Sequence, residues 1–282
     1  MAVSLGEGNT PLLQAPRLSE RLGCELWLKW EGANPTGSFK DRGMTLAVSR
    51  AVERGAPGVV CASTGNTAAS AAAYAARAGL PAVIVLPKGA VARGKLAQVL
   101  AAGAELRELD GTFEEAHALA RRLADDEGLV NVNSINPDRI EGQASAAREV
   151  VEQLGGPPDV LALPYGGGGN TLAYARGFEE AGRGSPRLLS VQSAQRADTV
   201  ATAIRIVEPI HRAQAEAVTE VVTVPDGELL EWWRAIGRLE GLFCEPASAA
   251  GVAGVAQVRP CGVVVCVLTG HGLKDPDAAE RL

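Results

Sequence analysis

Two glycine-rich segments stand where a protein backbone could bind an anion. Residues 63–67 (STGNT) and 166–170 (GGGGN) each follow an apolar run and open a stretch of helical pattern. Backbone N–H groups and the positive end of a helix favour phosphate at such a junction. Four successive glycines let the backbone curl around the anion, so we interpret residues 166–170 as a phosphate-binding loop rather than a linker. For residues 63–67, an ordinary capped turn is an equal alternative.

Lys40 is the candidate nucleophile. It follows the turn at residues 34–37 and stands at a predicted helix start. The positive end of a helix and partial desolvation both favour the neutral amine, which can attack a carbonyl carbon and form a Schiff base. The alternative for a lone lysine is a solvated surface residue.

The composition argues against several classes of protein. The 282 residues include 27 basic and 33 acidic side chains, a formal net charge of −6, and no long basic run, which argues against a nucleic-acid binder. No apolar stretch reaches the roughly 18 residues of a membrane helix, and the first residues do not form a secretory signal. We therefore expect a cytoplasmic protein whose partner is a small-molecule substrate, with neither nucleic acid nor membrane involved.

Metal and thiol chemistry are also disfavoured. The three histidines have no metal-binding spacing, and the five cysteines form no CxxC pair. We expect no metal site and no disulfide framework. An enzyme of this composition would take its chemistry from a bound cofactor.

The elements that must position these residues alternate between strand and helix patterns. Short apolar runs bordered by glycine or proline predict buried strands, and the stretches between them predict helices. This alternation predicts an α/β fold with mainly parallel strands. The predicted strands are 58–63, 80–87, 159–164, 188–192 and 262–270, with weaker candidates at 105–109 and 129–132.

Several helix boundaries can also be predicted. Helices are expected at 67–78 and 95–102, each followed by a glycine, and Thr112 with Glu115 forms a capping box for the next helix. One helix is expected over 141–154, before a linker-like break at 155–159. Asp226 is expected to cap a helix over 227–240.

Six motifs together closely resemble threonine synthases, pyridoxal-phosphate enzymes of the tryptophan synthase β-like fold. The match runs in order from Gly6 to Asp277 and rests on NPTGSFKDRG (34–43), ASTGNT (62–67), NVNSINPDRIEGQ (131–143), TVATAIRI (199–206), FCEPASAA (243–250) and LTGHGLKDP (268–276). The resemblance implies two three-layer αβα domains and a homodimer. It implies a large cofactor-binding domain of residues 1–40 and 147–282, and a small, mobile substrate-binding domain of residues 41–146.

The resemblance also implies roles for individual residues. Lys40 matches the lysine that bonds pyridoxal 5'-phosphate in a Schiff base and later moves protons, and Asn66 matches the asparagine beside the 3-oxygen of the cofactor. Thr269 matches the hydroxyl at the pyridine nitrogen, and a neutral hydroxyl there implies a largely unprotonated nitrogen. The loop matching the cofactor-phosphate site comprises Gly166, Gly167, Gly168, Gly169 and Asn170. The implied substrate-binding residues are Ser63, Thr64, Thr67, Asn133, Ser134 and Arg139.

The implied reaction converts O-phospho-L-homoserine and water into L-threonine and phosphate by γ-elimination and β-replacement. A serine or threonine ammonia-lyase, or another β-eliminating enzyme, is the alternative within enzymes, and a non-catalytic protein that binds pyridoxal phosphate or an amino acid is the alternative outside them. The chain departs from the family at residues 166–170, where GNAGN is usual, and looks abbreviated at 192–199 and 206–226. Asp138 replaces a usually apolar or aromatic residue, and its charge could pair with Arg139 or repel phosphate.

Overall fold

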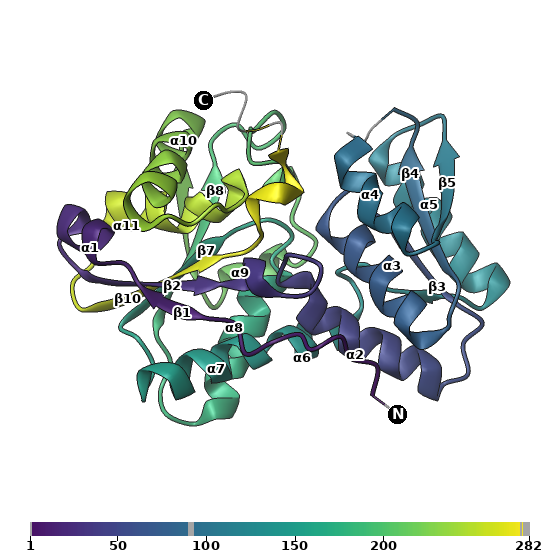
Figure 1. Cartoon of the computed structure of the whole chain (residues 1–282), viewed down its shortest axis with the longest axis horizontal. Helices are drawn as coiled ribbons and strands as arrows, with labels where there is room; N and C mark the ends of the chain where they lie inside the picture. The colour runs from purple at the N-terminus through teal and green to yellow at the C-terminus, as the bar shows by residue number, and fades with distance from the viewer. Residues whose placement is uncertain (1, 90–92, 277, 279–282) are drawn as a thin grey trace. The chain divides into compact units, whose positions relative to one another are not determined.

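The chain divides into two compact units, which we describe separately. The computed structural model describes residues 2–89, 93–276 and 278. One unit comprises residues 1–7, 34–36 and 40–142, and the other comprises residues 8–33, 37–39 and 143–282. Each unit has its own β-sheet and its own hydrophobic cores (Figure 1).

The first unit is a three-layer αβα sandwich around a parallel four-stranded sheet. The strand order is β5-β4-β3-β6. Helices α2, α3 and α4 cover one face and α5 covers the other. The strands are β3 (Val59–Ala62), β4 (Ala82–Pro87), β5 (Glu105–Leu109) and β6 (Val130–Asn131). The helices are α2 (Lys40–Glu53), α3 (Asn66–Ala78), α4 (Arg93–Ala101), α5 (Phe113–Glu127) and α6 (Pro137–Gln143).

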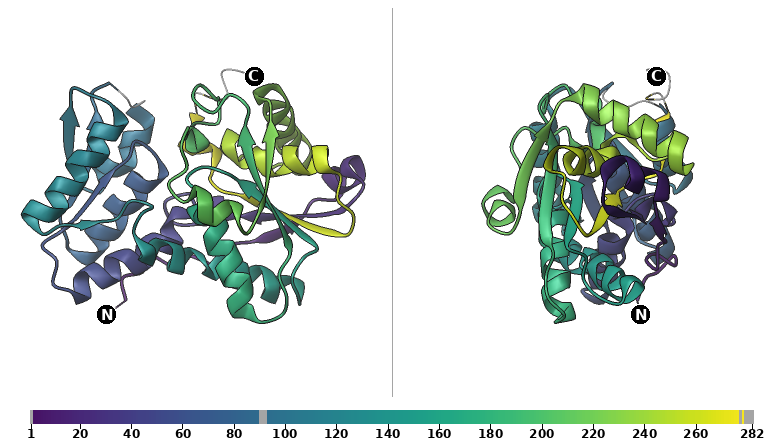
Figure 2. Two further views of the ribbon diagram at one scale, coloured as in Figure 1. Left: turned by 180° about the vertical axis from the view of Figure 1, so that it is seen from behind. Right: turned by 90° about the vertical axis from the view of Figure 1, so that its left-hand side faces the viewer.

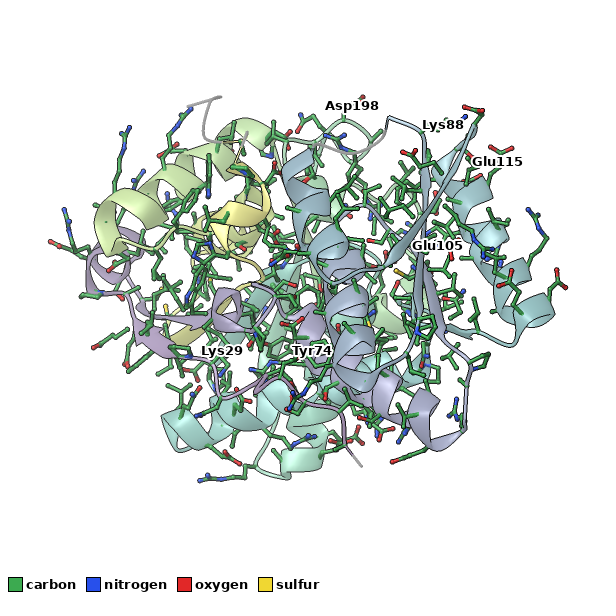
Figure 3. The ribbon with its side chains drawn as sticks, turned by 45° about the vertical axis from the view of Figure 1, so that its right-hand side comes forward. Lys29, Tyr74, Lys88, Glu105, Glu115 and Asp198 are labelled. Atoms are coloured by element: carbon green, nitrogen blue, oxygen red, sulfur yellow. The ribbon has the colours of Figure 1, made fainter. Side chains whose placement is uncertain are left out.

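Alternation along β3 explains the two cores of this unit. Val59 and Cys61 pack with the alanine-rich face of α3, whereas Val60 and Ala62 pack against α5. Successive strand residues point to opposite faces, so a strand buried on both sides is apolar throughout. Tyr74 of α3, labelled in Figure 3, donates its hydroxyl to Glu7 at 2.7 Å and so fastens the first residues of the chain to the unit.

The second unit is also an αβα sandwich, built on a six-stranded sheet of order β1-β2-β10-β7-β8-β9. Antiparallel pairing occurs between β1 and β2, and the other described strands pair in parallel. The strands are β1 (Leu12–Gln14), β2 (Glu25–Trp30), β7 (Val160–Pro164), β8 (Arg187–Ser193), β9 (Glu220–Val224) and β10 (Val263–Leu268). The helices are α1 (Pro16–Leu22), α7 (Ser145–Leu154), α8 (Gly169–Ala181), α9 (Arg212–Glu216), α10 (Asp226–Ala235) and α11 (Ala250–Val258).

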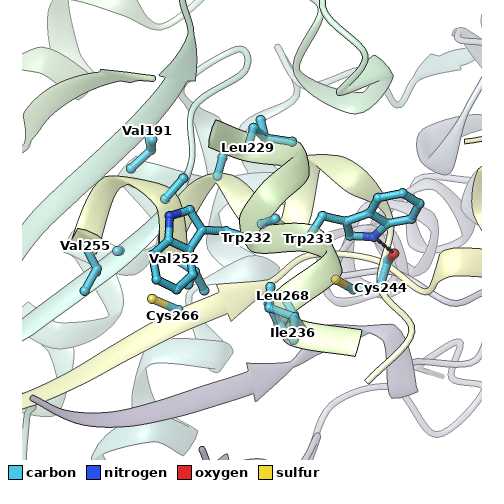
Figure 4. Packing of buried hydrophobic residues seen from close by; sticks show 14 of the residues in the cluster. Val191, Leu229, Trp232, Trp233, Ile236, Cys244, Val252, Val255, Cys266 and Leu268 are labelled. Atoms are coloured by element: carbon cyan, nitrogen blue, oxygen red, sulfur yellow. Dashed lines mark hydrogen bonds between the residues drawn. The ribbon is translucent and has the colours of Figure 1, made fainter. Parts of the chain in front are cut away.

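Two hydrophobic cores hold these helices on opposite faces of the second sheet. Helices α7 and α8 lie side by side on one face, seen from two directions in Figures 1 and 2. Helices α1, α10 and α11 cover the other face, where Trp232 and Trp233 are almost completely buried. Trp233 donates its indole N–H to the carbonyl of Cys244 at 2.6 Å (Figure 4), so the ring fills the core with its polar atom satisfied.

A buried lysine ties β2 to α7. Lys29, labelled in Figure 3, has a fully buried side chain. Its ammonium donates to the carbonyl of Thr10, to Glu149 and to Gln153 over 2.8–2.9 Å. A buried charge is tolerated only when it is paired and hydrogen-bonded, as it is here.

The expected fold class is confirmed, and the predicted strands form within one or two residues of their expected ends. The capping box is confirmed too, because Glu115 N donates to the Thr112 hydroxyl and Thr112 N donates to the Glu115 carboxylate. Among the described residues, no helix is both long and apolar enough to cross a membrane.

Two helix predictions were wrong. Residues 141–154 form the ends of two helices, α6 and α7, with a break at Ala144, next to the point where the chain passes between units. Asp226 begins α10 rather than capping it, and Pro225 is the N-cap. The Asp226 carboxylate instead accepts from Ser193, Thr199 and the backbone of Val200 over 2.5–2.8 Å, contacts that sequence spacing does not reveal. The helix also ends at Ala235 and continues as a π-helical turn over Ile236–Glu240.

Candidate active site

In the second unit, three predicted site segments meet at one edge of the sheet. Strands β7 and β10 are parallel neighbours, so the glycine loop after β7 and Thr269 after β10 lie at the same carboxyl edge. Phe39 donates its N–H to the carbonyl of Thr269 at 3.0 Å, and His271 donates to the carbonyl of Gly37 at 2.9 Å. The residue before Lys40 is therefore fixed to the strand end that carries Thr269. Ligands of α/β folds bind at this edge.

The glycine loop is held tightly from behind. Gly168 is the N-cap of α8 and has φ +87°, which favours glycine. A Cβ on Gly168 would lie 3.1 Å from the Cβ of Ala215 and 3.2 Å from that of His211. His211 donates its backbone N–H to the carbonyl of Gly167 at 3.0 Å. The loop is therefore a fixed backbone structure and not a flexible linker.

The opening of α8 has the donors that an anion needs. No side chain in the described part of the chain caps this helix. The Nδ2 of Asn170, in its first turn, is buried and has no hydrogen-bond partner among the described residues. Orphan donors at a positive helix end suit the phosphate of a cofactor.

Thr269 belongs to a buried polar cluster. Its hydroxyl donates to the Glu245 carboxylate at 3.1 Å and lies 3.2 Å from the Ser248 hydroxyl. Thr269, Glu245 and Ser248 are each at most 4% exposed. Burial, with the Glu245 charge as the second cause, raises the pKa of the adjacent Cys244 thiol, which therefore stays neutral.

Lys40 is the first residue of α2 and its side chain is half-buried. The next residue, Asp41, is fully buried and fixes the first turn of this helix. Its carboxylate accepts from the N–H and hydroxyl of Thr36 at 2.7 and 2.6 Å, and from the Ser70 hydroxyl of α3 at 2.6 Å. An acidic residue in a first helical turn also compensates the positive end of the helix.

The remaining predicted residues gather at the carboxyl edge of the first sheet. Strands β3 and β6 are parallel neighbours, so the 63–67 turn and the segment starting at Asn133 leave the sheet on the same side. Gly65 is the N-cap of α3, and Ser63, Thr64, Asn66 and Thr67 are all partly exposed around the start of that helix. Ser134 is likewise partly exposed.

Asn133 has a structural task at this edge. Its side-chain Oδ1 accepts from the N–H of Ala62 at 2.9 Å and its Nδ2 donates to the carbonyl of Ala62 at 2.8 Å. The side chain, 4% exposed, thus clamps the end of β3. We read Asn133 as the residue that positions the 63–67 turn.

Arg139 is a buried cation with an unused donor. It is 1% exposed, and its Nη1 donates to the carbonyl of Val132 at 2.7 Å. Its Nε finds no hydrogen-bond partner in the described residues. Burial lowers the pKa of Arg139 to about 10, partly offset by Cys61 and Asp41. Gly43 permits this burial, because a Cβ there would lie 2.5 Å from the Arg139 carbonyl oxygen.

The charge of Asp138 is directed elsewhere. Its carboxylate pairs with Arg50 and lies 3.7 Å from the guanidinium of Arg54. Arg50 also pairs with Glu141 at 2.7 Å. Asp138 is thus engaged by cations of α2 and the residue that follows it.

Sequence reasoning missed three buried polar residues. Glu245 and Ser248 lie within the quoted motif FCEPASAA but received no role, and Asp41 follows Lys40 directly. An acid within a run of small and apolar residues was the available signal for Glu245. The described residues contain no group of three or more histidine, cysteine, aspartate or glutamate side chains that could hold a metal ion.

Comparison with known proteins defines the class first. Residues 3–270 match the family model described as pyridoxal-phosphate dependent enzyme. The chain is 49% identical to the threonine synthase of Synechocystis sp., covering 99% of this chain and 80% of the relative. It is 47% identical to that of Mycobacterium leprae, covering 99% and 85%. The chain belongs to the pyridoxal-phosphate dependent enzymes and, within them, to the threonine synthase family.

Solved structures agree on the fold. A maize serine racemase superposes with a TM-score of 0.87 at 22% identity, covering 97% of this chain and 91% of the other. A bacterial-type threonine deaminase, from T.th., gives a TM-score of 0.81 at 28% identity, covering 94% and 92%. The Synechocystis alignment spans 306 positions, more than the chain has residues, so that relative has residues without a counterpart here.

Pyridoxal 5'-phosphate is the cofactor of this family, and the residues of the second unit fit it. A glycine loop with no room for a Cβ at Gly168 and an orphan Asn170 donor suit the phosphate group. The Thr269 hydroxyl suits a hydrogen bond to a ring nitrogen, and the Lys40 amine suits a bond to an aldehyde carbon.

Proposed function

We propose that this enzyme converts O-phospho-L-homoserine and water into L-threonine and phosphate. The observation that carries the proposal is Arg139, a buried guanidinium with a free Nε at the carboxyl edge of the first sheet. A guanidinium fork pairs with two phosphate oxygens, and desolvation strengthens that pairing. The names of relatives 43–49% identical over almost the whole chain support the same reaction.

We assign the binding tasks by unit. In the second unit, residues 166–170 hold the cofactor phosphate and Thr269 contacts the ring nitrogen. In the first unit, Asn66 lies beside the cofactor ring, the hydroxyls of Ser63, Thr64 and Thr67 bind the substrate carboxylate, and Ser134 joins Arg139 on the substrate phosphate. Asn133 holds the turn through its hydrogen bonds to Ala62.

Bound pyridoxal phosphate supplies an electron sink for carbanions formed next to the substrate amino group. Lys40 holds the cofactor until substrate arrives, and its freed Nζ then moves protons at the α- and β-carbons. The hydrogen bonds of Asp41 fix the helical turn that Lys40 opens, and the backbone bond of Phe39 to Thr269 fixes the residue before it. The backbone that carries the amine is thus held on both sides of Lys40.

A serine or threonine ammonia-lyase is the competing function, and Arg139 distinguishes the two. A hydroxy-amino-acid substrate carries no phosphate, so it has no use for a second buried phosphate receptor. The fold alone does not decide, because threonine deaminases and serine racemases share it.

The decisive experiment measures phosphate release from O-phospho-L-homoserine and formation of 2-oxobutanoate from L-threonine. Wild type is expected to give the first product. Arg139→Gln should raise KM about tenfold or more, since one charge-assisted hydrogen bond contributes about 1.5–3 kcal/mol. Arg148→Gln, which removes an exposed arginine paired with Glu180, is the matched control and should leave KM unchanged. A protein that makes 2-oxobutanoate but releases no phosphate would overturn the proposal.

Domain roles and assembly remain predictions. We propose that the first unit is the mobile substrate-binding part and the second the cofactor-binding part, and that the enzyme is a cytoplasmic homodimer. Sedimentation of the holoenzyme and limited proteolysis with and without substrate test these points.

A further inference from the structure

The cluster around Thr269 contains a carboxylate that the proposed function leaves unused. Glu245 is 4% exposed and its backbone N–H donates to the carbonyl of Gly270 at 2.9 Å. A Cβ on Gly270 would lie only 2.6 Å from the Glu245 carboxylate. The glycine after Thr269 therefore makes room for this carboxylate beside the strand end.

The hydroxyl protons of the cluster can be assigned. A hydroxyl has one proton to donate and two lone pairs, and an ionised carboxylate only accepts. Thr269 donates its proton to Glu245 Oε1 at 3.1 Å. Ser248 accepts from the Gly270 N–H at 3.2 Å and lies 3.2 Å from the Thr269 oxygen and 3.4 Å from the Gly270 carbonyl. The shorter of the two contacts lets Ser248 donate to Thr269.

This assignment fixes what Thr269 can offer to a further partner. Its proton is committed to Glu245 and one lone pair to Ser248, so the remaining lone pair can only accept a hydrogen bond. A bare pyridine nitrogen is itself an acceptor and would find no donor there. A protonated ring nitrogen would donate to that lone pair and would also lie near the negative charge of Glu245.

We propose that Glu245 is a positioning residue that acts through Thr269 and keeps the cofactor ring nitrogen protonated. The inference rests on the proposed placement of Thr269 at that nitrogen. It changes the expectation drawn from the threonine hydroxyl alone, which was an unprotonated nitrogen. A protonated ring is the stronger electron sink, which suits a reaction that must stabilise negative charge through two successive eliminations and additions.

The test is nitrogen-15 NMR of the holoenzyme reconstituted with cofactor labelled at the ring nitrogen, titrated with pH in the absence of substrate. Wild type should show a protonated nitrogen at neutral pH. Glu245→Gln keeps the size of the side chain but removes its charge, and should lower the ratio of protonated to neutral nitrogen at least about tenfold, as expected when an opposite charge within about 4–6 Å is lost. Glu231→Gln, an exposed glutamate of α10 in the same unit, is the matched control and should match wild type.

Gly270→Ala gives a second, independent route to the same result. Gly270 does not have the positive φ that disfavours alanine, and the added methyl group would push the carboxylate away from Thr269 without altering either hydroxyl. It should lower the ratio in the same direction as Glu245→Gln. A merely structural glutamate would not move this signal.

A neutral nitrogen in wild type at neutral pH would overturn the proposal without any variant. So would an unchanged ratio in a Glu245→Gln protein that binds the cofactor. Because the measurement uses no substrate, it is separate from the phosphate-release assay. A chain that releases no phosphate yet shows a Glu245-dependent protonated nitrogen would refute the proposed function alone.

Discussion

Replacing Gly177 with alanine tests whether the contact between α7 and α8 holds the phosphate loop in place. Gly177 is a buried residue of α8. A Cβ there would lie 2.2 Å from the carbonyl oxygen of Ala144 and 2.7 Å from the Cβ of Ala147. Carbon atoms pack at about 3.5–4.0 Å. The atom at 2.2 Å belongs to the backbone, so one of the two helices must move.

The expected cost follows from two opposing effects. Overpacking against a fixed backbone costs up to about 3 kcal/mol. Alanine is more favourable than glycine within a helix by about 1 kcal/mol. The net loss in the free energy of unfolding should therefore be about 2 kcal/mol. Because α8 begins at the glycine loop, displacement of the helix should also weaken binding of pyridoxal phosphate.

Tryptophan fluorescence during urea unfolding measures this loss, because Trp27, Trp30, Trp232 and Trp233 all belong to the second unit. Gly227→Ala is the matched control. Gly227 lies in α10 of the same unit with no described atom within 4 Å of an added Cβ, so this variant should be as stable as wild type or slightly more stable. Equal or greater stability for Gly177→Ala would refute the packing argument.

Three further predictions concern single side chains. Gly168→Ala should weaken cofactor binding by about tenfold or more in absorbance titrations, because a left-handed backbone costs alanine about 1 kcal/mol and the methyl group meets close neighbours; Gly182→Ala, with φ +63° and no described atom within 4 Å, isolates the backbone strain and should leave binding intact. Asn133→Ala should destabilise the first unit by about 2–4 kcal/mol, because both backbone groups of Ala62 lose a buried partner; hydrogen exchange of β3 measures it, and unchanged protection would contradict the clamp. Burial, and then the charge of a nearby arginine, lowers the pKa of His117 below 6.5, so stability is lost as pH falls through that lowered pKa; His117→Gln should show a flatter dependence of the urea midpoint on pH, and an equally steep one would count against it.

Much of the fold could be predicted from the sequence because local pattern and global structure agree. The 58–63 and 262–270 runs are apolar throughout, as strands buried on both faces must be, and their bounding glycines and prolines mark the ends. The capping box of α5 depends on residues three apart. Asp226 failed as a cap because its partners at 193–200 are distant in sequence, and spacing rules cannot weigh them.

The same limit applies to the site. Lys40 and the glycine loop could be proposed from local chemistry, since each stands at a helix start. The contact of Glu245 with Thr269 joins residues 24 apart in sequence and needs the pairing of the 37–39 segment with 269–271, which becomes visible only in the fold. The clamp formed by Asn133 is hidden for the same reason.

The short length of β6 has a consequence for association between molecules. An edge strand exposes unpaired N–H and C=O groups on which another chain can add a strand. Strand β6 pairs over only two residues, Val59 with Val130 and Val60 with Asn131, which is too little to template such addition. The opposite edge, β5, carries Glu105 (labelled in Figure 3), whose pairing with Arg107 at 2.6 Å places charge along that strand. Both edges of this parallel sheet are thereby guarded against edge-to-edge aggregation, even though its inner strands are apolar throughout.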